Sequence, residues 1–317
     1  MLVFIIKRLA NAVMVMLAVA LLAFLIFRLA GDPVEMMANE QMTQADRDNL
    51  RERLGLNDGL MTQYGRFVVN AAQGNFGISY RNGQDVLSLI AERFPATLEL
   101  VFVATLISLL LGLPLGVLTA IKRGKWYTEG LQFLSIVGVS LPSFVVGILL
   151  ILVFSVSLGW FPAFGRGDVV QLGGWSTGLL TPSGRLAILL PAIALSLYQV
   201  TLVMRLVRAE MLEVLRSDYV KFARARGNPR WRIYFRHALR NCLMPVVTMT
   251  ALNIGSLIAF ALITETFLQW PGIGIVFIRA VTILDLPVMA AALCMISFIF
   301  VLPNTMVARA YAVMDPR

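Results

Sequence analysis

Residues 100–121 read LVFVATLISLLLGLPLGVLTAI, a run of 22 residues that contains no charged side chain. About 20 predominantly apolar residues in a helix cross the roughly 30 Å hydrocarbon core of a bilayer. A charged side chain at the centre of such a helix costs about 2.5–3.5 kcal/mol on insertion scales, so long uncharged windows mark membrane spans. The stretch therefore predicts a membrane-spanning helix.

Five further uncharged windows, each of at least 19 residues, occur elsewhere in the chain. We therefore predict an all-α polytopic membrane protein in which residues 1–317 form a single transmembrane domain. The first window could also be the apolar core of a cleaved signal peptide, but it runs on to residue 27 and is too long for one. The six predicted transmembrane helices lie at about 9–30, 97–121, 131–158, 186–206, 243–264 and 286–308.

The composition excludes a water-soluble enzyme of one or two domains. The chain is 58% hydrophobic and 14% charged, with a mean hydropathy of +0.79. Soluble domains average about 45–50% apolar and about 25% charged residues, so a soluble fold could not bury this much apolar surface. The net charge of +9 would indicate nucleic acid in a soluble protein. In a membrane protein it fits basic residues on the cytoplasmic side, and we expect no nucleic-acid partner.

The charged residues outside the windows predict the orientation. The side that holds both termini carries 17 Lys+Arg and 5 Asp+Glu, whereas the opposite side carries 10 Lys+Arg and 13 Asp+Glu. Basic residues collect on the cytoplasmic side of membrane proteins. The N and C termini and the loop 207–242 are therefore predicted to be cytoplasmic, and the loop 31–95 to be extracytoplasmic.

Side chains that would support enzymatic chemistry are sparse. His237 is the only histidine, so we expect no metal site built from several histidines. Cys242 and Cys294 lie in or beside apolar windows and are expected to be buried thiols without a disulfide. Residues 174–178 match the G-x-S-x-G nucleophile pattern, but they lie in a predicted extracytoplasmic loop across the membrane from His237, so we expect no hydrolase. No G-x-x-x-x-G-K-[ST] motif occurs, so an ATPase would have to be a separate polypeptide.

Two segments between the spans carry weaker signals. The extracytoplasmic loop 31–95 contains helix-like patches at 45–54 and 86–94 separated by glycines, which predicts a small cap rather than an independent domain. Residues 266–278 are apolar but too short to cross a bilayer. They predict an interfacial or re-entrant element with Trp270 at the level of the lipid headgroups.

Several residues inside the predicted spans admit two interpretations. Four prolines are expected to kink helices, either as ordinary bundle packing or so that helices can rock during transport. Gly112 and Gly116 form a small-xxx-small step that permits close helix contact. Ser196, Gln199 and Asn253 either line a translocation path or make hydrogen bonds in helix packing. The prolines are Pro114, Pro142, Pro191 and Pro303.

The predicted cytoplasmic loop contains the sequence SDYVKFARARGNPRWRIYFRHALRNCLMP at 217–245. The pattern predicts a helix that ends at Gly227, a turn through 228–229 and a second basic helix that enters the membrane at Pro245. A short helix on the membrane face suits docking into a groove on a partner. A solvated basic loop that follows the charge asymmetry of membrane proteins is an equally open interpretation.

This loop resembles the coupling loop of ATP-binding-cassette (ABC) importer permeases, and more closely the B-type permease subunit of the dipeptide, oligopeptide and nickel class. The resemblance departs from the general motif in two places, because Lys221-Phe222-Ala223 replaces the usual Glu-Ala-Ala start and Ala308 stands where members often carry Asp. In the loop it rests on 218–220, 223–227, 236–241 and Pro245. It continues along nearly the whole chain, at GDP (31–33), GNFGIS (74–79), PATLE (95–99), SLPSF (140–144), LGWFP (158–162), LPA (190–192), ETFLQWPGIG (265–274) and DPR (315–317).

The resemblance implies the ABC importer permease fold and a transporter subunit that makes no covalent bonds. The implied partners are a second homologous permease, two ATPase subunits and an extracytoplasmic substrate-binding protein. ATP and Mg²⁺ would bind to the ATPase subunits, and no cofactor to this chain. The implied location is the inner (plasma) membrane of a bacterial cell, and the implied substrate is a short peptide, with glutathione, a nickel chelate or an oligosaccharide as alternatives. A secondary carrier or channel is a further alternative, disfavoured because the predicted spans lack charges near the midplane.

The resemblance also assigns roles to particular residues. Tyr219, Phe222, Ala223 and Arg226 follow helical i, i+3, i+4, i+7 spacing and are predicted to share the face that enters the ATPase groove. Gly227 is predicted to cap this helix with a positive φ. The full set expected to couple to the ATPase is Asp218, Tyr219, Phe222, Ala223, Arg224, Ala225, Arg226 and Gly227. A structural role at the outer mouth is expected for Glu265, Trp270, Pro271, Gly272 and Gly274, with Glu265 accepting hydrogen bonds from backbone N–H groups of 270–274.

Overall fold

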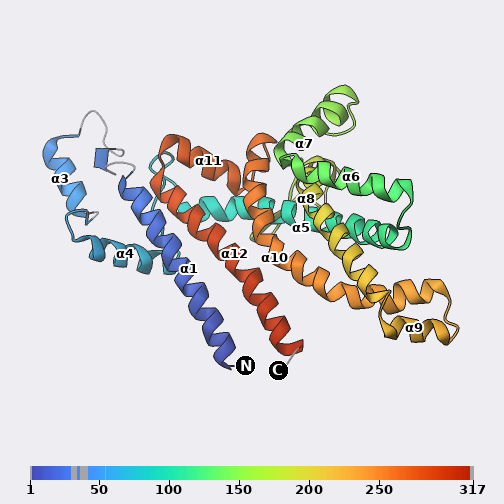
Figure 1. The fold of residues 1–317 in the computed structure, drawn as a ribbon. Coiled ribbons are helices and arrows are strands. Elements are labelled where there is room, and N and C mark those ends of the chain that lie inside the picture. Colours follow the sequence, from blue (N-terminus) through green and yellow to red (C-terminus); the bar gives the residue numbers. More distant parts are fainter. Residues whose placement is uncertain (1, 30–33, 36–41, 54, 315–317) are drawn as a thin grey trace. The chain divides into compact units, whose positions relative to one another are not determined.

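The computed structural model describes residues 2–29, 34–35, 42–53 and 55–314. Helices make up almost all of the regular structure in this part of the chain (Figure 1). The chain divides into two compact units. The first combines Met1–Pro95 with Gly272–Arg317, and the second is Ala96–Pro271.

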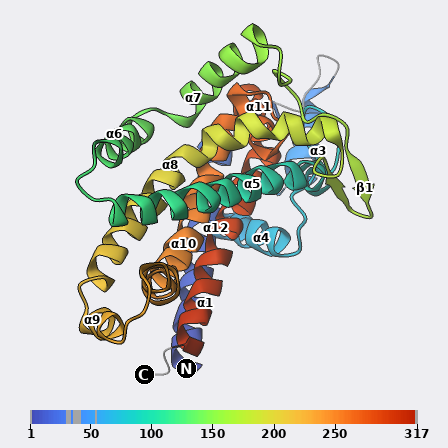
Figure 2. The ribbon, with the colours of Figure 1, turned by 90° about the vertical axis from the view of Figure 1, so that its right-hand side faces the viewer.

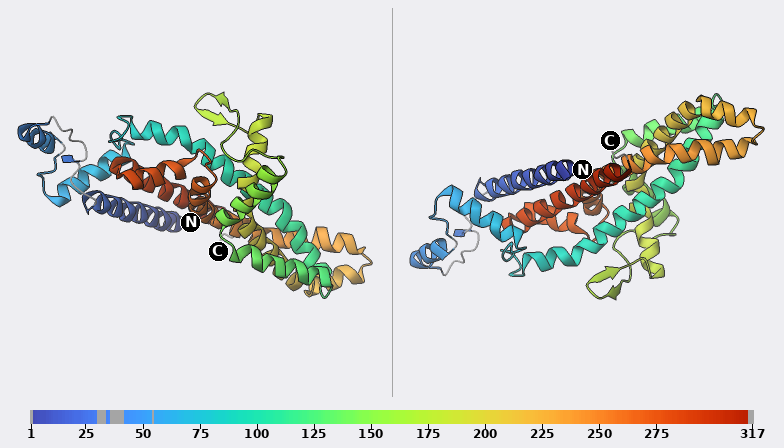
Figure 3. Two further views of the ribbon diagram at one scale, coloured as in Figure 1. Left: turned by 90° about the horizontal axis from the view of Figure 1, so that it is seen from above. Right: turned by 90° about the horizontal axis from the view of Figure 1, so that it is seen from below.

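The first unit is built on two long helices from opposite ends of the chain. α1 and α12 lie side by side, with the start of α1 beside the end of α12 (Figures 1 and 3). α11 packs beside α12, and α4 packs beside α1, where the Tyr64 hydroxyl donates to the carbonyl of Leu17 at 2.9 Å. The helices of this unit are α1 (Leu2–Leu29), α3 (Gln44–Arg53), α4 (Leu60–Ala72), α11 (Ile273–Ile283) and α12 (Leu286–Met314).

A buried carboxylate anchors the loop that follows α4 in the first unit. Asp285 precedes α12 and is 4% exposed. It accepts a hydrogen bond from the Ser79 hydroxyl and another, at 3.2 Å, from the backbone N–H of Tyr80. A buried charge is costly without such partners, so these bonds hold the loop against the start of α12. Burial, and then the neighbouring Asp285 charge, raise the pKa of Tyr80.

The second unit contains three long helices that pack together, with a bent helix pair and a short hairpin around them (Figure 2). The β1–β2 hairpin is antiparallel and pairs Val170 with Thr177. It projects from the helices of this unit (Figure 3). The elements are α5 (Val86–Ile121), α6 (Trp126–Ser140), α7 (Ser143–Leu150), the π-helix η1 (Ile151–Ser157), β1 (Val170–Leu172), β2 (Trp175–Thr177), α8 (Pro182–Val214), α9 (Asp218–Ala225), the π-helix η2 (Arg232–Ala238) and α10 (Leu239–Phe267).

Two glycines of α5 allow α8 to approach it closely. A Cβ atom added at Gly112 would lie 2.7 Å from Cγ1 of Val203, and one at Gly116 would lie 2.6 Å from Cβ of Val207. Both distances are shorter than any ordinary carbon–carbon contact, so these positions accept glycine alone without a shift of the helices. The small-xxx-small prediction is thereby confirmed as a packing contact. The same two valines of α8, Val203 and Val207, also pack in one apolar cluster with Cys242 and Val246 of α10.

Three helices in the described part of the chain are long and apolar enough to cross a membrane by themselves: α5, α8 and the continuous helix Arg232–Phe267 formed by η2 and α10. The pair Trp126–Ser140 and Ser143–Ser157 passes the same test together, as a fourth, although it is bent by 106°. The apolar parts of α1 and α12, Ala10–Ile26 and Leu286–Val301, are shorter. Six spans therefore stay a prediction.

Two helix boundaries differ from the sequence-based expectation, and both involve proline. α5 runs unbroken from Val86 to Ile121, so the patch at 86–94 belongs to the same helix as the predicted span and Pro95 does not end it. In contrast, the predicted span 131–158 is broken at Leu141, which has extended backbone angles (φ −91°, ψ 129°). A residue that precedes proline is disfavoured in the helical region, and Leu141 precedes Pro142.

Candidate functional site

The predicted coupling segment folds as a short helix, α9, at the end of the α8 and α10 pair (Figure 1). Ser217 has extended angles (φ −65°, ψ 152°) and begins the helix. Asp218 lies in the first turn, where its charge is favourable at the positive end of the helix dipole. Lys221 Nζ lies 2.8 Å from the Asp218 carboxylate. The local sequence thus specifies where this helix starts.

Seven of the eight residues predicted for coupling are exposed on α9 and the turn that follows it. Phe222 is 63% exposed and Tyr219 is 51% exposed, and the Arg226 guanidinium lies 5.5 Å from the centre of the Phe222 ring. Ala223 is the exception at 5%, so the expectation that it shares the exposed face is wrong. The chain turns back after α9 and η2 packs beside it; Val220 is buried in α9 as well.

The turn after α9 is a Schellman motif, as the glycine signal predicts. Gly227 has φ +77°. Its N–H donates to the carbonyl of Arg224 at 2.9 Å, and the N–H of Asn228 donates to that of Ala223 at 3.4 Å. The Asn228 side chain adds a bond from Nδ2 to the same Ala223 oxygen at 3.0 Å. These bonds satisfy carbonyls that a helix end otherwise leaves open, and they fix the direction in which the chain leaves α9.

A polar contact ties α9 to η2. The Tyr219 hydroxyl and Nδ1 of His237 are hydrogen-bonded at 2.6 Å, and the two rings meet edge to face with centroids 5.5 Å apart. His237 lies in η2, which continues without a break into α10. Because α9 is held both by the Gly227 turn and by this contact, a displacement of α9 would be passed directly to the helix Arg232–Phe267.

The surroundings of α9 are strongly basic. From Tyr219 to Thr264 the sequence has seven Lys and Arg residues and no Asp or Glu. In η2 and just before it, Trp231 is 58% exposed and Phe235 is 55% exposed. A surface that combines exposed aromatic rings with positive charge is complementary to an acidic partner with apolar pockets.

The three polar residues proposed for a translocation path lie in the second unit, and all are largely covered. The Ser196 hydroxyl donates to the carbonyl of Ile193 at 2.9 Å, and Nδ2 of Asn253 donates to that of Met249 at 2.9 Å. Both contacts lie within a single helix. Gln199 is 1% exposed, and within the described residues neither polar atom of its side chain has a hydrogen-bond partner.

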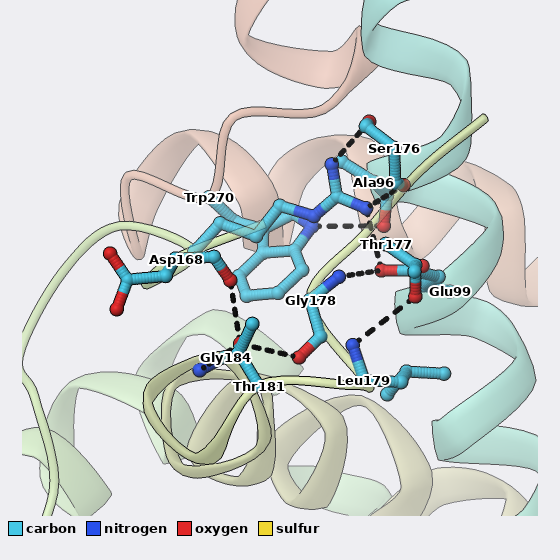
Figure 4. Close-up of polar contacts among 11 residues, drawn as sticks. Ala96, Glu99, Asp168, Ser176, Thr177, Gly178, Leu179, Thr181, Gly184 and Trp270 are labelled. Carbon is cyan, nitrogen blue, oxygen red and sulfur yellow. Dashed lines mark hydrogen bonds and ion pairs between the residues drawn. The ribbon is translucent and has the colours of Figure 1, made fainter. Parts of the chain in front are cut away.

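The residues predicted at the outer mouth fall in both units. In the second unit, Glu265 is fully buried near the end of α10, and its carbonyl accepts from the N–H of Trp270 at 2.9 Å. Trp270 is 1% exposed, and its indole Nε1 donates to the carbonyl of Ala96 at 3.0 Å (Figure 4). The protein itself covers the Trp270 ring and satisfies its N–H, so the ring does not face lipid, and its position at the level of the headgroups stays a prediction.

The remaining part of the 266–278 element also differs from the prediction. It is not one element, because α10 ends at Phe267 and α11 begins at Ile273. The second unit ends at Pro271. Gly272 begins the C-terminal segment of the first unit, Gly272–Arg317. Gly272 precedes α11 with extended angles (φ −97°, ψ −167°), and Gly274 is buried in its first turn.

A buried ion pair at the start of the second unit is the main feature that the sequence did not indicate (Figure 4). Nη2 of Arg166 lies 2.6 Å from Oε2 of Glu99, and the two side chains are 8% and 5% exposed. Arg166 also donates to Ser176, at 3.0 Å to the hydroxyl and 2.6 Å to the backbone carbonyl. The Gly178 N–H lies 3.4 Å from the same carboxylate oxygen. The sequence held one signal for this pair: Glu99 directly precedes one uncharged window, Arg166 directly follows another, and the two side chains have opposite charges.

The surroundings of this ion pair give the serine of the G-x-S-x-G segment a structural role. Ser176 lies in β2, and its hydroxyl accepts a hydrogen bond from Arg166. His237 is instead hydrogen-bonded to Tyr219, in the contact between η2 and α9 already described. The serine therefore serves to attach the β1–β2 hairpin to α5. Nearby, the Thr181 hydroxyl accepts from the Gly184 N–H at 3.1 Å and caps α8 (Figure 4).

The sequence matches two family profiles that together cover most of the chain. "Binding-protein-dependent transport system inner membrane component" matches residues 112–317, and the N-terminal profile of the same kind of transport membrane component matches residues 1–101. The chain is 39% identical to the Di/tripeptide transport system permease protein DppB of Pseudomonas aeruginosa, across 100% of this chain and 98% of that protein. It is 36% identical to the Oligopeptide transport system permease protein AppB of Bacillus subtilis, across 99% of this chain and 98% of the relative.

A solved structure shares the fold at low sequence identity. The match to a chain of the inward-facing MetNI methionine ABC transporter has a TM-score of 0.54 and 17% identity, covering 72% of this chain and 96% of that one. At this identity the likeness concerns the fold alone.

Proposed function

The chain belongs to the family of binding-protein-dependent transport system inner membrane components, and on that premise we propose that it is the permease subunit of an ATP-driven importer of short peptides. Relatives that match over nearly their full length are named as permeases for di- and tripeptides and for oligopeptides. The observation that carries the proposal in the structure is α9, an exposed helix joined to a long apolar helix by the Gly227 turn and the Tyr219–His237 contact.

In this proposal the importer contains a second homologous permease, two ATPase subunits that bind ATP and Mg²⁺, and an extracytoplasmic binding protein. The basic surroundings of α9 support an acidic groove on each ATPase as its partner. Closure of the ATPases on ATP would displace α9, and the displacement would pass into Arg232–Phe267 and change which mouth is open.

We also infer that the subunit lies in the bacterial inner membrane with six spans and cytoplasmic termini. The bent pair α6–α7/η1, α1 and α12 would supply the three spans beyond α5, α8 and η2–α10. The start of α1 and the end of α12 lie at the same end of the α1–α12 pair, which supports an even number of crossings. A cysteine at Asn57 should be labelled by an impermeant thiol reagent on intact cells, whereas one at Asn228 should not, with Cys242 and Cys294 replaced by alanine. The reverse pattern would overturn the orientation.

The substrate path would pass the polar residues Ser196, Gln199 and Asn253, and the outer-mouth residues would have a structural role there. The burial of Glu265 and Trp270 supports the latter assignment. Bonds from Glu265 to backbone N–H groups of 270–274 stay a prediction.

The experiment that tests the function is reconstitution. The chain is purified with its partner permease and ATPases, placed in liposomes, and supplied with the binding protein and radiolabelled trialanine. We expect ATP-dependent uptake of trialanine and an ATPase rate that rises when the loaded binding protein is added. Uptake that persists without ATP and ATPase subunits would contradict the proposal and indicate a secondary carrier.

A further inference from the structure

Gln199 is a buried polar side chain to which the packing described above assigns no role. It is 1% exposed, and its amide oxygen and nitrogen both lack a hydrogen-bond partner within the described residues. Ser196 and Asn253, the other two polar residues considered for the path, each bond to a carbonyl of their own helix. Buried side-chain amides in proteins are almost always paired, so the exception requires an explanation.

The position of Gln199 follows from the packing of α5 against α8. Gln199, Val203 and Val207 are four residues apart and form one buried ridge of α8. Gly112 of α5 lies against Val203 of α8, and Gly116 lies against Val207, so the two helices run parallel to each other. One turn before Gly112 the next α5 residue on this face is Ser108, which is fully buried. Ser108 and Gln199 therefore lie at the same depth.

α10 contributes a third polar residue near this depth. Cys242 and Val246 of α10 pack in the cluster that contains Val203 and Val207 of α8. Four residues after Val246 on the same ridge comes Thr250, which is 5% exposed and whose hydroxyl lacks a hydrogen-bond partner in the described part of the chain. The apolar seam between the helices thus changes, one turn further on, into a polar layer formed by Ser108, Gln199 and Thr250.

We propose that Gln199 contacts the substrate, pairing its carboxamide with a backbone amide of the passing peptide when this polar layer opens. The inference rests on the proposed function of peptide import. A primary carboxamide donates one hydrogen bond and accepts another, which is the complement of a peptide group. Such a pair does not depend on the peptide's side chains. It would let one path accept different peptides without a buried charge.

The unpartnered amide also predicts an unusual response to substitution. Gln199→Met keeps the volume and removes both polar atoms. Because an unsatisfied buried amide is destabilising, the apolar variant should be at least as heat-stable as the wild-type complex in the nucleotide-free state. Its uptake of trialanine should fall about tenfold in kcat, since the pairing partner of the peptide is lost. Thr119→Ala, which removes a buried bond from the hydroxyl to the Gly116 carbonyl within α5, is the control and should leave uptake near wild type.

Thiol labelling tests the opening of the layer directly. Gln199→Cys is placed in a complex with Cys242 and Cys294 replaced by alanine, and the rate of reaction with N-ethylmaleimide is measured. We expect the rate to differ about tenfold between nucleotide-free and vanadate-trapped complexes, and trialanine with the binding protein to slow the faster reaction. Val207→Cys, on the same ridge but packed against Gly116, should react slowly in both states.

Three results would overturn the assignment of Gln199: a lower melting temperature for Gln199→Met, the same labelling rate at position 199 in both states, or labelling that trialanine does not slow. Each can occur while the wild-type complex imports trialanine, so each is distinct from failure of the proposed function. That failure would show as a wild-type complex that does not take up trialanine.

Discussion

Replacing Gly227 by valine should separate ATP hydrolysis from transport. Gly227 has φ +77°, and a Cβ atom added there would meet no other atom within 4 Å. The cost of a side chain is therefore backbone strain alone. It amounts to about 1–2 kcal/mol for an L-residue in the left-handed region, and valine is among the residues least tolerant of it.

The strain acts on the bonds that fix α9. A penalty of about 1–2 kcal/mol shifts the balance between the capped and the uncapped turn by roughly 5- to 30-fold. The Schellman bonds and the Asn228–Ala223 bond would then be lost in a large fraction of molecules, and α9 would no longer move together with η2. We expect the peptide taken up per ATP hydrolysed to fall at least severalfold, with normal membrane insertion.

Two further variants make this test specific. Asparagine tolerates the left-handed region, so Gly227→Asn should retain most of the coupling. Gly124 has φ +80°, also has no neighbouring atom within 4 Å and lies in the loop before α6. Gly124→Val therefore introduces the same strain away from α9 and should leave uptake per ATP unchanged. The assay measures uptake and ATPase together in the reconstituted complex. Equal coupling in Gly227→Val and wild type, or equal losses in Gly227→Val and Gly124→Val, would refute the reasoning.

Three further outcomes are expected. Arg166→Met should destabilise the detergent-solubilised complex by about 3–5 kcal/mol, because it leaves the buried carboxylate of Glu99 without its ion-pair partner. In thermal unfolding, the double variant Arg166→Met/Glu99→Leu should recover much of this stability. An equal loss of stability in the single and the double variant would show that the ion pair is not the cause. Gly116→Ala should lower the stability of the complex by about 1–3 kcal/mol, since its Cβ would lie 2.6 Å from Val207. Gly130→Ala in α6, where the added Cβ would meet no atom within 4 Å, should not lower it, and the same thermal assay compares the two variants. Glu265→Gln should assemble and mildly reduce uptake, whereas normal uptake in Glu265→Leu would refute a structural role for the buried carboxyl.

Signals that depend on a few neighbouring residues predicted local structure well. The run of residues around Gly227 indicated a helix, a glycine cap and a turn, and the structure has each of them. Glycines four apart in α5 indicated a close helix contact, and the clash distances at Gly112 and Gly116 confirm it. Both features are set by backbone geometry within one or two turns, which periodicity and residue type report directly.

Features that depend on distant partners could not be predicted. Arg166 and Glu99 are 67 residues apart, and nothing in either segment specifies the other. Ala223 fits the exposed face of α9 by spacing, yet it is buried in the folded chain, where η2 packs beside α9. Proline shows the same limit, since Pro95 lies within the unbroken helix α5, whereas at Pro142 the predicted span is broken into two helices bent by 106°. Which of these a proline does depends on the packing around it.

The contact between α8 and α10 gives the helix Arg232–Phe267 the geometry of a lever. At about 1.5 Å per residue the 36 residues extend over roughly 54 Å. The cluster of Val203 and Val207 with Cys242 and Val246 lies about a third of the way from the α9 end, where it would act as a fulcrum if the helix tilted. The arm beyond it is roughly twice as long as the arm next to α9. A displacement of 1 Å imposed at the short arm would therefore become about 2 Å at the far end, so small strokes of the ATPases would be amplified before they reach Glu265.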